Sequence, residues 1–376
     1  MRLIGRIVST ALLLACCLAV SMIHAAEGRI PIWEPVALGV GSTPGKYVVT
    51  RDVFGAGGPT IFITGVAGAL EEVDIDLNGF TLFGDPAGPG LPVIEAINLR
   101  TLTIRNGSLR NLSGTGDIIR ATNVQKVVIE DVKTLDGDNG IFLESVGSFA
   151  IRRNIIANSG VNGILIDGAG LPVSMSGVVK ENLVKNSIEN GIVIMNNHSS
   201  VAVQDNRIDG TLNGNGIWLQ FGNDCLVAEN TVEEAAKQGI FLEGLRGCKI
   251  YNNVTAFNGG NGILSLADMS LFLDNVSTNN VLSGIEQFGV LGHFDRNVLS
   301  QNTCYGLHFI GPENTYGRNT ARGNAGGAAC GAPCGGGPIE ICPAPYGGGA
   351  FPPDLCVDAP GTTSFCDNMM PGPPRS

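Results

Sequence analysis

Aromatic and polar side chains recur together near the middle of the chain, in a pattern that could bind sugars. The segments Trp218-Leu219-Gln220 and Phe241-Leu242-Glu243 each place an aromatic residue two positions before a polar one. Aromatic rings can stack on the faces of pyranose rings, and carboxylate and amide oxygens accept hydrogen bonds from hydroxyls. We therefore predict that Trp218, Gln220, Phe241 and Glu243 line a carbohydrate-binding site.

Four other side chains are weaker candidates for acid or base catalysis: Glu144, Asp167, Glu286 and His308. Glycoside hydrolases commonly use two carboxylates about 5 to 9.5 Å apart, and Glu144 and Asp167 fall one repeat apart. Glu286 and His308 could form an acid/base couple. An exposed ion pair, worth about 0–1 kcal/mol, is the simpler interpretation of that couple.

The sequence gives little reason to predict a metal site or a cofactor. Glu71, Glu72, Asp74 and Asp76 could bind calcium. However, Asp74 and Asp76 alternate with apolar residues, which is the pattern of the outward side of a strand. Cys330 and Cys334 lack a second matched pair of metal ligands. We predict no metal and no cofactor.

The predicted site residues belong to a phrase that recurs eight times between residues 139 and 309. It consists of a polar residue, a glycine and an alternating apolar run, as in Asn162-Gly163-Ile164-Leu165-Ile166. Successive glycines, from Gly140 to Gly306, are separated by 23, 28, 25, 23, 23, 22 and 22 residues. A period of this size is typical of a stacked repeat architecture. It favours one elongated solenoid over two or three separate domains.

Strand geometry then divides each phrase into inward and outward positions. Successive side chains of a strand point to opposite sides, so the Ile and Leu positions face the core. The outward positions form two columns: Phe142, Leu165, Val193, Trp218, Phe241, Leu264, Glu286 and His308; and Glu144, Asp167, Met195, Gln220, Glu243, Leu266, Phe288 and Ile310. This mixture of rings and carboxylates suits a sugar groove. Alternatively, the tail of the chain or another subunit covers the apolar part.

A second column of asparagines keeps the same phase. It comprises Asn78, Asn106, Asp131, Asn154, Asn182, Asn206, Asn230, Asn253, Asn275, Asn297 and Asn319. Asparagine at a corner can adopt left-handed backbone angles or satisfy neighbouring backbone groups. Stacked once per coil, these amides can form an internal ladder. Charged residues precede them, so ion pairs between coils are expected, such as Glu130 with Arg153 and Asp274 with Arg296.

The chain resembles the right-handed parallel β-helix repeat proteins with the pectin-lyase-like fold. The resemblance covers about residues 46–325 and rests on residues 47–52, 75–82 and 104–109 and on the Asn-Gly-Ile series. It implies an all-β, right-handed parallel β-helix (β-solenoid) of about 10–11 coils with capped ends. The catalytic signatures of polygalacturonases and alginate epimerases are missing from the sequence, so the resemblance implies a fold without assigning an activity.

The two ends of the chain differ from the repeat. Residues 1–26 have the positive, apolar and small-residue regions of a signal peptide. Export is therefore expected, to the periplasm or the extracellular space. Ordinary secretion is favoured over lipoprotein anchoring at Cys16, because residues 18–23 stay apolar. Residues 27–60 are expected to form an N-terminal cap and first strand, residues 61–325 the β-helix, and residues 326–376 a Gly/Pro/Cys-rich disulfide-bonded cap or tail.

Cysteine and charge content bound the environment and the partners. Eight cysteines follow the signal segment, an even number that favours disulfides in an exported chain: Cys225, Cys248, Cys304, Cys330, Cys334, Cys342, Cys356 and Cys366. Cys225 and Cys248 should be neighbours on adjacent coils, as a disulfide or as stacked thiols, and Cys304 would then pair with a tail cysteine. Without residues 1–26, 21 basic face 34 acidic residues, a net charge of −13. Such a chain disfavours nucleic acid.

Three functions are consistent with these observations. The first is a secreted protein that presents a carbohydrate-binding surface to a polysaccharide or glycan. The second is a polysaccharide-degrading enzyme, a glycoside hydrolase or a polysaccharide lyase. The third is a structural or adhesive cell-surface protein without catalytic activity. No apolar run of 18 residues follows the signal segment, so no membrane span is expected. The sequence leaves the oligomeric state open.

Overall fold

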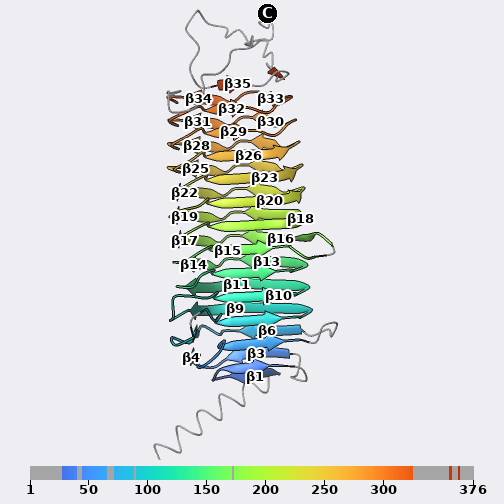
Figure 1. The fold of residues 1–376 in the computed structure, drawn as a ribbon, viewed down its shortest axis with the longest axis vertical. Coiled ribbons are helices and arrows are strands. Elements are labelled where there is room, and N and C mark those ends of the chain that lie inside the picture. Colours follow the sequence, from blue (N-terminus) through green and yellow to red (C-terminus); the bar gives the residue numbers. More distant parts are fainter. Residues whose placement is uncertain are drawn as a thin grey trace, which may run out of the picture.

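The computed structural model describes residues 28–39, 45–65, 72–88, 90–171, 173–324, 355–357 and 363–364. In these residues the chain winds into a rod of stacked coils (Figure 1). Every strand pairing is parallel, between one coil and the next. The described residues contain no helix long and apolar enough to cross a membrane. The predicted all-β solenoid of about 11 turns is confirmed.

Each full coil contributes strands to three faces of the rod. Face 1 carries the Gly-Ile phrase, and its strands pair in register, so that Ile141, Ile164, Ile192 and Ile217 stack directly. This face consists of β2 (Val36–Leu38), β5 (Ile61–Thr64), β8 (Ile94–Ile97), β10 (Ile119–Thr122), β12 (Ile141–Glu144), β15 (Ile164–Asp167), the start of β18 (Ile192–Gln204), β20 (Ile217–Asn223), β23 (Ile240–Arg246), β26 (Ile263–Asp268), β29 (Ile285–Gln287), β32 (Leu307–Phe309) and β35 (Leu355–Val357).

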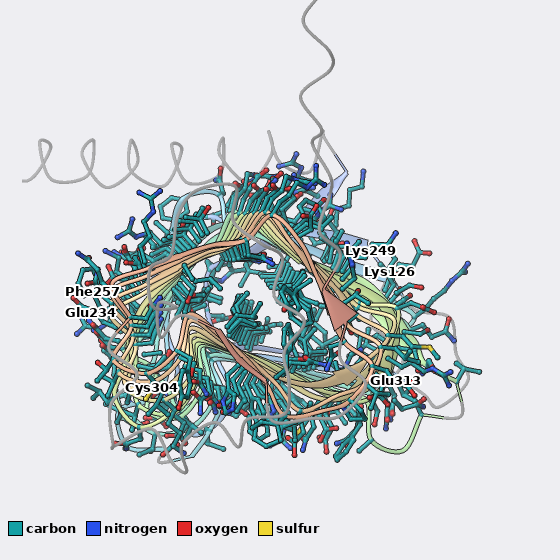
Figure 2. The ribbon with its side chains drawn as sticks, turned by 90° about the horizontal axis from the view of Figure 1, so that it is seen from above. Lys126, Glu234, Lys249, Phe257, Cys304 and Glu313 are labelled. Atoms are coloured by element: carbon teal, nitrogen blue, oxygen red, sulfur yellow. A yellow bond between two sulfur atoms is a disulfide. The ribbon has the colours of Figure 1, made fainter. Side chains whose placement is uncertain are left out.

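Face 2 follows face 1 in each coil. It consists of β1 (Arg29–Ile32), β3 (Gly45–Val49), β6 (Glu72–Asp76), the first halves of β9 (Thr101–Arg110) and β11 (Lys126–Leu135), β13 (Ser148–Arg152), β16 (Met175–Lys180), the end of β18, β21 (Leu226–Ala228), β24 (Lys249–Tyr251), β27 (Leu271–Leu273), β30 (His293–Asp295), β33 (Thr315–Tyr316) and β36 (Thr363–Ser364). In the view along the rod, Lys126 and Lys249 mark the start of this face (Figure 2).

Face 3 closes each coil and leads to the next. It consists of β4 (Val53–Phe54), β7 (Thr81–Phe83), the second halves of β9 and β11, β14 (Ile155–Ala157), β17 (Leu183–Ser187), β19 (Arg207–Thr211), β22 (Thr231–Ala235), β25 (Val254–Ala256), β28 (Val276–Thr278), β31 (Val298–Ser300) and β34 (Thr320–Arg322). Glu234 and Phe257 lie at the end of this face (Figure 2).

The inward positions form one continuous apolar core along the rod. Ile and Leu side chains from the Gly-Ile phrase are almost fully buried, as the alternation predicts. Toward the C-terminal coils the core contains three phenylalanine rings. Phe272 and Phe294 stack at 4.4 Å between ring centroids, and Phe309 meets Phe294 edge-on at 4.8 Å. Burial of these side chains is the main source of stability in such a fold.

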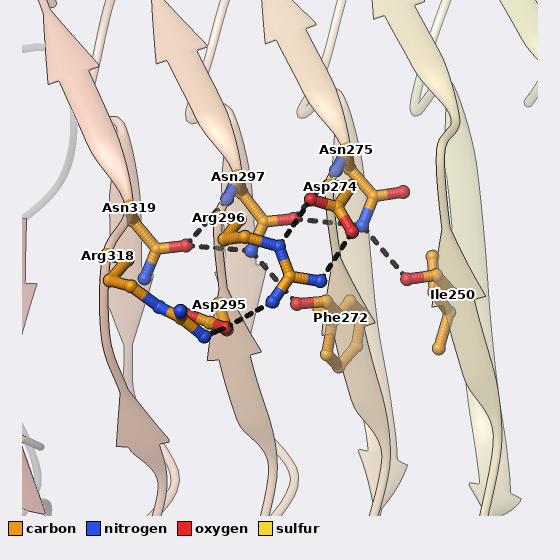
Figure 3. Close-up of polar contacts among 9 residues, drawn as sticks. All are labelled: Ile250, Phe272, Asp274, Asn275, Asp295, Arg296, Asn297, Arg318 and Asn319. Carbon is orange, nitrogen blue, oxygen red and sulfur yellow. Dashed lines mark hydrogen bonds and ion pairs between the residues drawn. The ribbon is translucent and has the colours of Figure 1, made fainter. Parts of the chain in front are cut away.

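A ladder of buried asparagine side chains runs along the corner between faces 2 and 3. Each Nδ2 donates to the Oδ1 of the asparagine one coil further on, at 2.8–3.0 Å, from Asn154 through Asn182, Asn206, Asn230, Asn253, Asn275 and Asn297 to Asn319. Figure 3 shows its last steps, where Asn275 and Asn297 also donate to the carbonyls of Ile250 and Phe272. The predicted ladder is confirmed over these coils.

The predicted column is wrong by one position in its first coils. Asn106 and Asp131 align with Arg153 rather than with Asn154, and have the left-handed φ values of 61° and 56°. Asn78 is also left-handed, at φ 51°. From Arg153 onward, the left-handed residue is the one that precedes the ladder asparagine. Asparagine suits both roles, since it tolerates left-handed angles and bonds backbone groups, so the sequence alone did not separate the two positions.

Ion pairs follow the outer side of the same corner. Arg153 contacts Glu130 at 3.1 Å, and Arg296 contacts Asp274 at 2.7 Å, as expected. Arg318 continues the row by bonding Asp295 (Figure 3). This guanidinium holds the pKa of the Asp295 carboxyl below its usual value. Charges of both signs thus pair along the outer side of an uncharged ladder, and Asp295 among them is buried.

Two further observations concern cysteines and the ends of the rod. Cys225 and Cys248, on adjacent coils, form a disulfide, and Cys304 is disulfide-bonded as well. The predicted signal peptide and most of residues 326–376 lie outside the described residues. Of the tail cysteines expected to pair with Cys304, Cys356, in β35, is the one within them. Strands β35 and β36 continue faces 1 and 2 by pairing with β32 and β33.

Candidate carbohydrate-binding site

The four residues predicted to bind sugar lie together on the outward side of face 1. Strands β20 and β23 pair in register, so Trp218 is opposite Phe241 and Gln220 is opposite Glu243. All four side chains are half-buried. Leu219 and Leu242, between them, are fully buried in the core. The apolar anchors of the repeat therefore fix the direction in which all four residues point.

The two aromatic rings form a pair across the coils. Their centroids are 5.8 Å apart, and their planes differ by 21°. This distance exceeds the strand spacing of about 4.8 Å, so the rings are offset and each keeps part of its surface uncovered. Aromatic surface held rigidly by a sheet offers contact area without a large loss of side-chain entropy on binding.

Hydrogen bonds hold the polar half of this cluster in place. Trp218 Nε1 and Gln220 Nε2 both donate to Oε2 of Glu243, at 3.2 and 2.9 Å. Neither Oε1 of Glu243 nor Oε1 of Gln220 has a partner among the described residues. The cluster thus keeps two acceptor oxygens beside the rings, oriented before any ligand arrives. Such an arrangement can accept hydrogen bonds from adjacent hydroxyls.

The neighbouring coils on face 1 are less polar. Val193, one coil before Trp218, is 1% exposed, and Leu264 and Leu266 follow Phe241 and Glu243. Leu266 is 39% exposed and Phe288, one coil further, 44%. The outward columns therefore contain an accessible apolar surface beside the four-residue cluster.

Two of the weaker candidates for catalysis, Glu144 and Asp167, are neighbours as predicted, on β12 and β15. Each is bound by other residues. Glu144 Oε2 accepts from Thr122 Oγ1 at 3.3 Å and Arg120 at 3.4 Å, and the Arg120 guanidinium lies 5.3 Å from the centre of the Phe142 ring. Arg120 was not foreseen, because its coil precedes the Asn-Gly-Ile series.

Asp167 is held by its own corner rather than by a catalytic partner. Its Oδ1 accepts from the Ala169 amide at 2.9 Å and from Asn196 Nδ2 at 2.8 Å. A carboxylate with such partners is well placed to order a turn. Glu144 and Asp167 are thus close in space, but the contacts that surround them are structural.

Glu286 and His308 contact one another, with His308 Nδ1 2.9 Å from Glu286 Oε1. The expectation of an exposed ion pair is wrong, since the side chains are only 18% and 9% exposed. Asn261 Nδ2 donates to the other oxygen of Glu286 at 2.7 Å, and the Tyr305 ring lies 5.0 Å from that of His308. The packing of adjacent coils, which the local sequence does not show, buries this pair.

Asn261 makes a contact with Glu286 that the repeat pattern did not predict. The asparagines of the Asn-Gly-Ile phrase form a second ladder, in which Asn162, Asn190 and Asn215 bond to the preceding coil. Gln238 and Ser283 occupy the equivalent positions on either side of Asn261. The backbone amide and Oδ1 of Asn261 stay in the ladder, but its Nδ2 donates to Glu286 instead of to the preceding coil. The replacement of asparagine by Gln238 and Ser283 in the repeated phrase was the sequence feature that could have indicated this contact.

His198 is a second residue that the sequence did not single out. It is 1% exposed, and its ring lies against Gly222, where an added Cβ would meet it at 2.2 Å. Neither ring nitrogen makes a hydrogen bond of good geometry. Burial lowers the pKa of His198 to about 4, despite an opposing contribution from the Gln220 backbone. The histidine is therefore a neutral core residue at neutral pH.

Of the residues considered for calcium, Glu71 lies outside the described residues, and Asp74 and Asp76 are paired with arginines. Asp74 contacts Arg105 at 3.1 Å, and Asp76 contacts Arg29 at 3.3 Å. A cavity of about 370 Å³ beside them on face 2 is also lined by Lys46. These cations neutralise the carboxylates that a calcium ion would need. No cluster of three or more metal-ligating side chains occurs in the part of the chain that the structure describes.

The architecture and the register of its faces define a parallel β-helix protein. The family described as "Right handed beta helix region" matches residues 87–208, 117–282 and 190–335, which together are more than half of the chain. The chain belongs to this family of right-handed β-helix proteins. No curated protein sequence matches it.

Solved structures with the same fold share little sequence with it. A mutant of the periplasmic alginate epimerase AlgG has a TM-score of 0.51 at 11% identity, over 86% of this chain and 77% of that one. Tailspike protein 3 of bacteriophage CBA120 has a TM-score of 0.54 at 11% identity, over 85% and 58%. The A-module of the Azotobacter vinelandii mannuronan C-5 epimerase AlgE4 has a TM-score of 0.49 at 12% identity, over 93% and 94%. The two similarities with TM-scores above 0.5 show the fold alone.

Proposed function

We propose that this protein is an exported β-helix protein that binds a carbohydrate on face 1, at the cluster of Trp218, Gln220, Phe241 and Glu243. The observation that carries the proposal is the shared carboxylate of Glu243. It accepts bonds from Trp218 and Gln220 and keeps its second oxygen available beside two offset rings. The combination of ring surface and oriented acceptors suits a sugar.

The charge of face 1 narrows the class of carbohydrate. Its outward positions carry the acids Glu95, Glu144, Asp167, Glu243 and Glu286. Of its two arginines, Arg120 is engaged by Glu144 and Arg246 ends β23. A polyanion would therefore meet more like than opposite charges on this face. The preferred ligand is therefore a neutral glycan, even though some proteins of this fold are named for alginate or mannuronan.

Export is part of the proposal and rests on two observations. The first 26 residues have the composition of a signal peptide, and the disulfide between Cys225 and Cys248 requires an oxidising compartment. Fractionation of cells that express the full chain tests this point. The mature protein should appear in the periplasm or the medium, with residues 1–26 removed.

Binding can be tested on a glycan array with matched variants. Trp218→Ala and Phe241→Ala each remove one ring of the pair, and binding of neutral glycans should fall by about tenfold or more in both. Phe257→Ala is the control, because Phe257 is 60% exposed at the end of face 3, away from the site. Equal binding by all three variants and the parent protein would refute the proposed site.

A second function, cleavage of polysaccharide, is favoured by one contact. His308 and Glu286 are 2.9 Å apart and largely shielded from water, and Asn261 orients the carboxylate. A histidine held by a carboxylate can act as a general base or acid. Release of reducing ends, or of unsaturated uronate absorbance, from a panel of polysaccharides tests this function. Product that persists in His308→Asn and Glu286→Gln would exclude this couple from catalysis.

A further inference from the structure

The N-terminal end of the rod has a slot that arises from an incomplete first coil. Only Trp33, Glu34 and Pro35 link β1 on face 2 to β2 on face 1, so this coil has no strand on face 3. The first strand of face 3 is β4, in the next coil, and it pairs with β7. The linking residues cross below β4 and leave a cavity of about 390 Å³ there. Sites for small molecules commonly have volumes of about 300–1,000 Å³.

Two aromatic side chains line this cavity. Phe54, on β4, stacks on Phe83 with centroids 4.4 Å apart and planes within 5°. Because Phe83 covers one face of the Phe54 ring, the opposite face is the one directed to the unfinished coil. Phe54 is 58% exposed and Trp33 is 45% exposed. The two exposed rings therefore give this cavity apolar surface that a ligand can cover.

The polar lining contains both donors and acceptors. Arg51 donates its Nε to the Trp33 carbonyl at 2.7 Å, which fixes the guanidinium beside the slot. Asp52 Oδ1 accepts from the Thr81 amide at 2.8 Å. Among the described residues, the two Nη groups of Arg51, Oδ2 of Asp52 and the carboxylate of Glu34 have no partner. The lining thus has one positive and two negative groups, none used in an ion pair.

We propose that this slot binds one pyranose unit of an uncharged glycan. The free face of Phe54 offers a stacking surface for the ring. The hydroxyls of a sugar both donate and accept, which matches carboxylates beside a guanidinium. A uronate or a sulfated sugar could use Arg51 but would be repelled by Glu34 and Asp52. The slot lies seven coils from the cluster around Trp218, about 34 Å along the rod at about 4.8 Å per coil, and is independent of it.

The tryptophan content of the chain allows a direct test. The protein contains two tryptophans, Trp33 and Trp218, one in each proposed site. Labelling with 5-fluorotryptophan therefore gives two fluorine signals, which Trp33→Phe and Trp218→Phe assign. Titration with neutral oligosaccharides of glucose, mannose, galactose and xylose should shift the Trp33 signal in a saturable manner. Phe54→Ala should weaken that response by about tenfold and leave the Trp218 response unchanged.

Controls separate this proposal from the others. Phe257→Ala, an exposed aromatic elsewhere, should change neither response. Phe54→Leu, which keeps most of the volume, should retain the fold and still weaken the Trp33 response. The slot proposal is overturned if no neutral oligosaccharide moves the Trp33 signal, if only polyuronates do, or if the signal follows protein concentration, which would indicate a second copy of the chain. The Trp218 signal reports on the face 1 site independently, so failure of one proposal is distinguishable from failure of the other.

Discussion

Replacement of Asn230 by alanine tests the role of the asparagine ladder in holding the coils together. The Asn230 side chain is fully buried and bonds four groups. Its Oδ1 accepts from the amide and from Nδ2 of Asn206, both at 3.0 Å, and its Nδ2 donates to the Val203 carbonyl at 2.8 Å and to Asn253 Oδ1 at 2.9 Å. The position is in the middle of the rod, where both neighbouring coils depend on it.

The size of the effect follows from the partners that lose their bonds. Asn253 Oδ1 would still accept from the amide of residue 230, which lies 3.1 Å away. The amide and one Nδ2 hydrogen of Asn206 and the Val203 carbonyl would have no substitute. A buried polar group without a partner costs about 1–3 kcal/mol. Three such groups give about 3–9 kcal/mol, and partial relaxation favours the lower part of that range as the decrease in the free energy of unfolding of Asn230→Ala.

The assay is denaturant unfolding, followed by circular dichroism and by tryptophan fluorescence. Asn213→Ala is the control: the same substitution at an exposed side chain between β19 and β20, for which we expect a change within about 0.5 kcal/mol. Because repeat proteins can unfold in steps, both probes should be compared before a single free energy is derived. The reasoning is refuted if Asn230→Ala and Asn213→Ala unfold within about 1 kcal/mol of each other.

Three further predictions follow from buried or shared groups. The pKa of His198 is 6.5 in the unfolded chain and about 4 in the fold, so the free energy of unfolding should fall by about 3 kcal/mol as the pH drops from about 6.5 to about 4. His198→Leu should lose this part of the pH dependence of unfolding. An unchanged dependence of the unfolding free energy on pH in that variant would contradict the prediction. The double variant Cys225→Ser, Cys248→Ser removes a disulfide that closes a loop of 23 residues. Its free energy of unfolding in denaturant titrations should be lower by up to about 3 kcal/mol. Equal unfolding midpoints of the variant and the parent protein would show that the coils alone fix these positions. Glu243→Gln retains an oxygen for Trp218 and Gln220 but loses the charge, so neutral glycan binding should weaken by about tenfold in calorimetry, and undiminished affinity would remove Glu243 from the site.

The regular parts of the fold were predictable because they repeat. The Gly-Ile phrase fixed which residues of face 1 point inward, and the register of Trp218 with Phe241 confirms the predicted alignment of neighbouring coils. The ladder from Asn154 onward was visible for the same reason. Asn106 and Asp131 were misplaced by one position, since the residue types at a left-handed corner and at a ladder position overlap.

The irregular features depend on packing between coils that no single segment encodes. The burial of His308 and the bond from Asn261 to Glu286 arise from three successive coils. The slot beside Phe54 exists because the link from β1 to β2 is only three residues long. This link lies outside the repeat, so the spacing of the repeat did not predict its length. The outward columns of the sequence predicted that Gln220 and Glu243 are neighbours. That Trp218 and Gln220 share one carboxylate oxygen of Glu243 was found only in the structure.

Isothermal titration of neutral oligosaccharides into the parent protein, Trp218→Ala and Phe257→Ala tests whether face 1 binds a neutral glycan at Trp218. We expect saturable binding to the parent and to Phe257→Ala, and affinity lower by about tenfold or more for Trp218→Ala. Saturable binding that Trp218→Ala leaves intact, or binding of polyuronates in place of neutral glycans, would contradict a neutral carbohydrate site at Trp218 and Glu243.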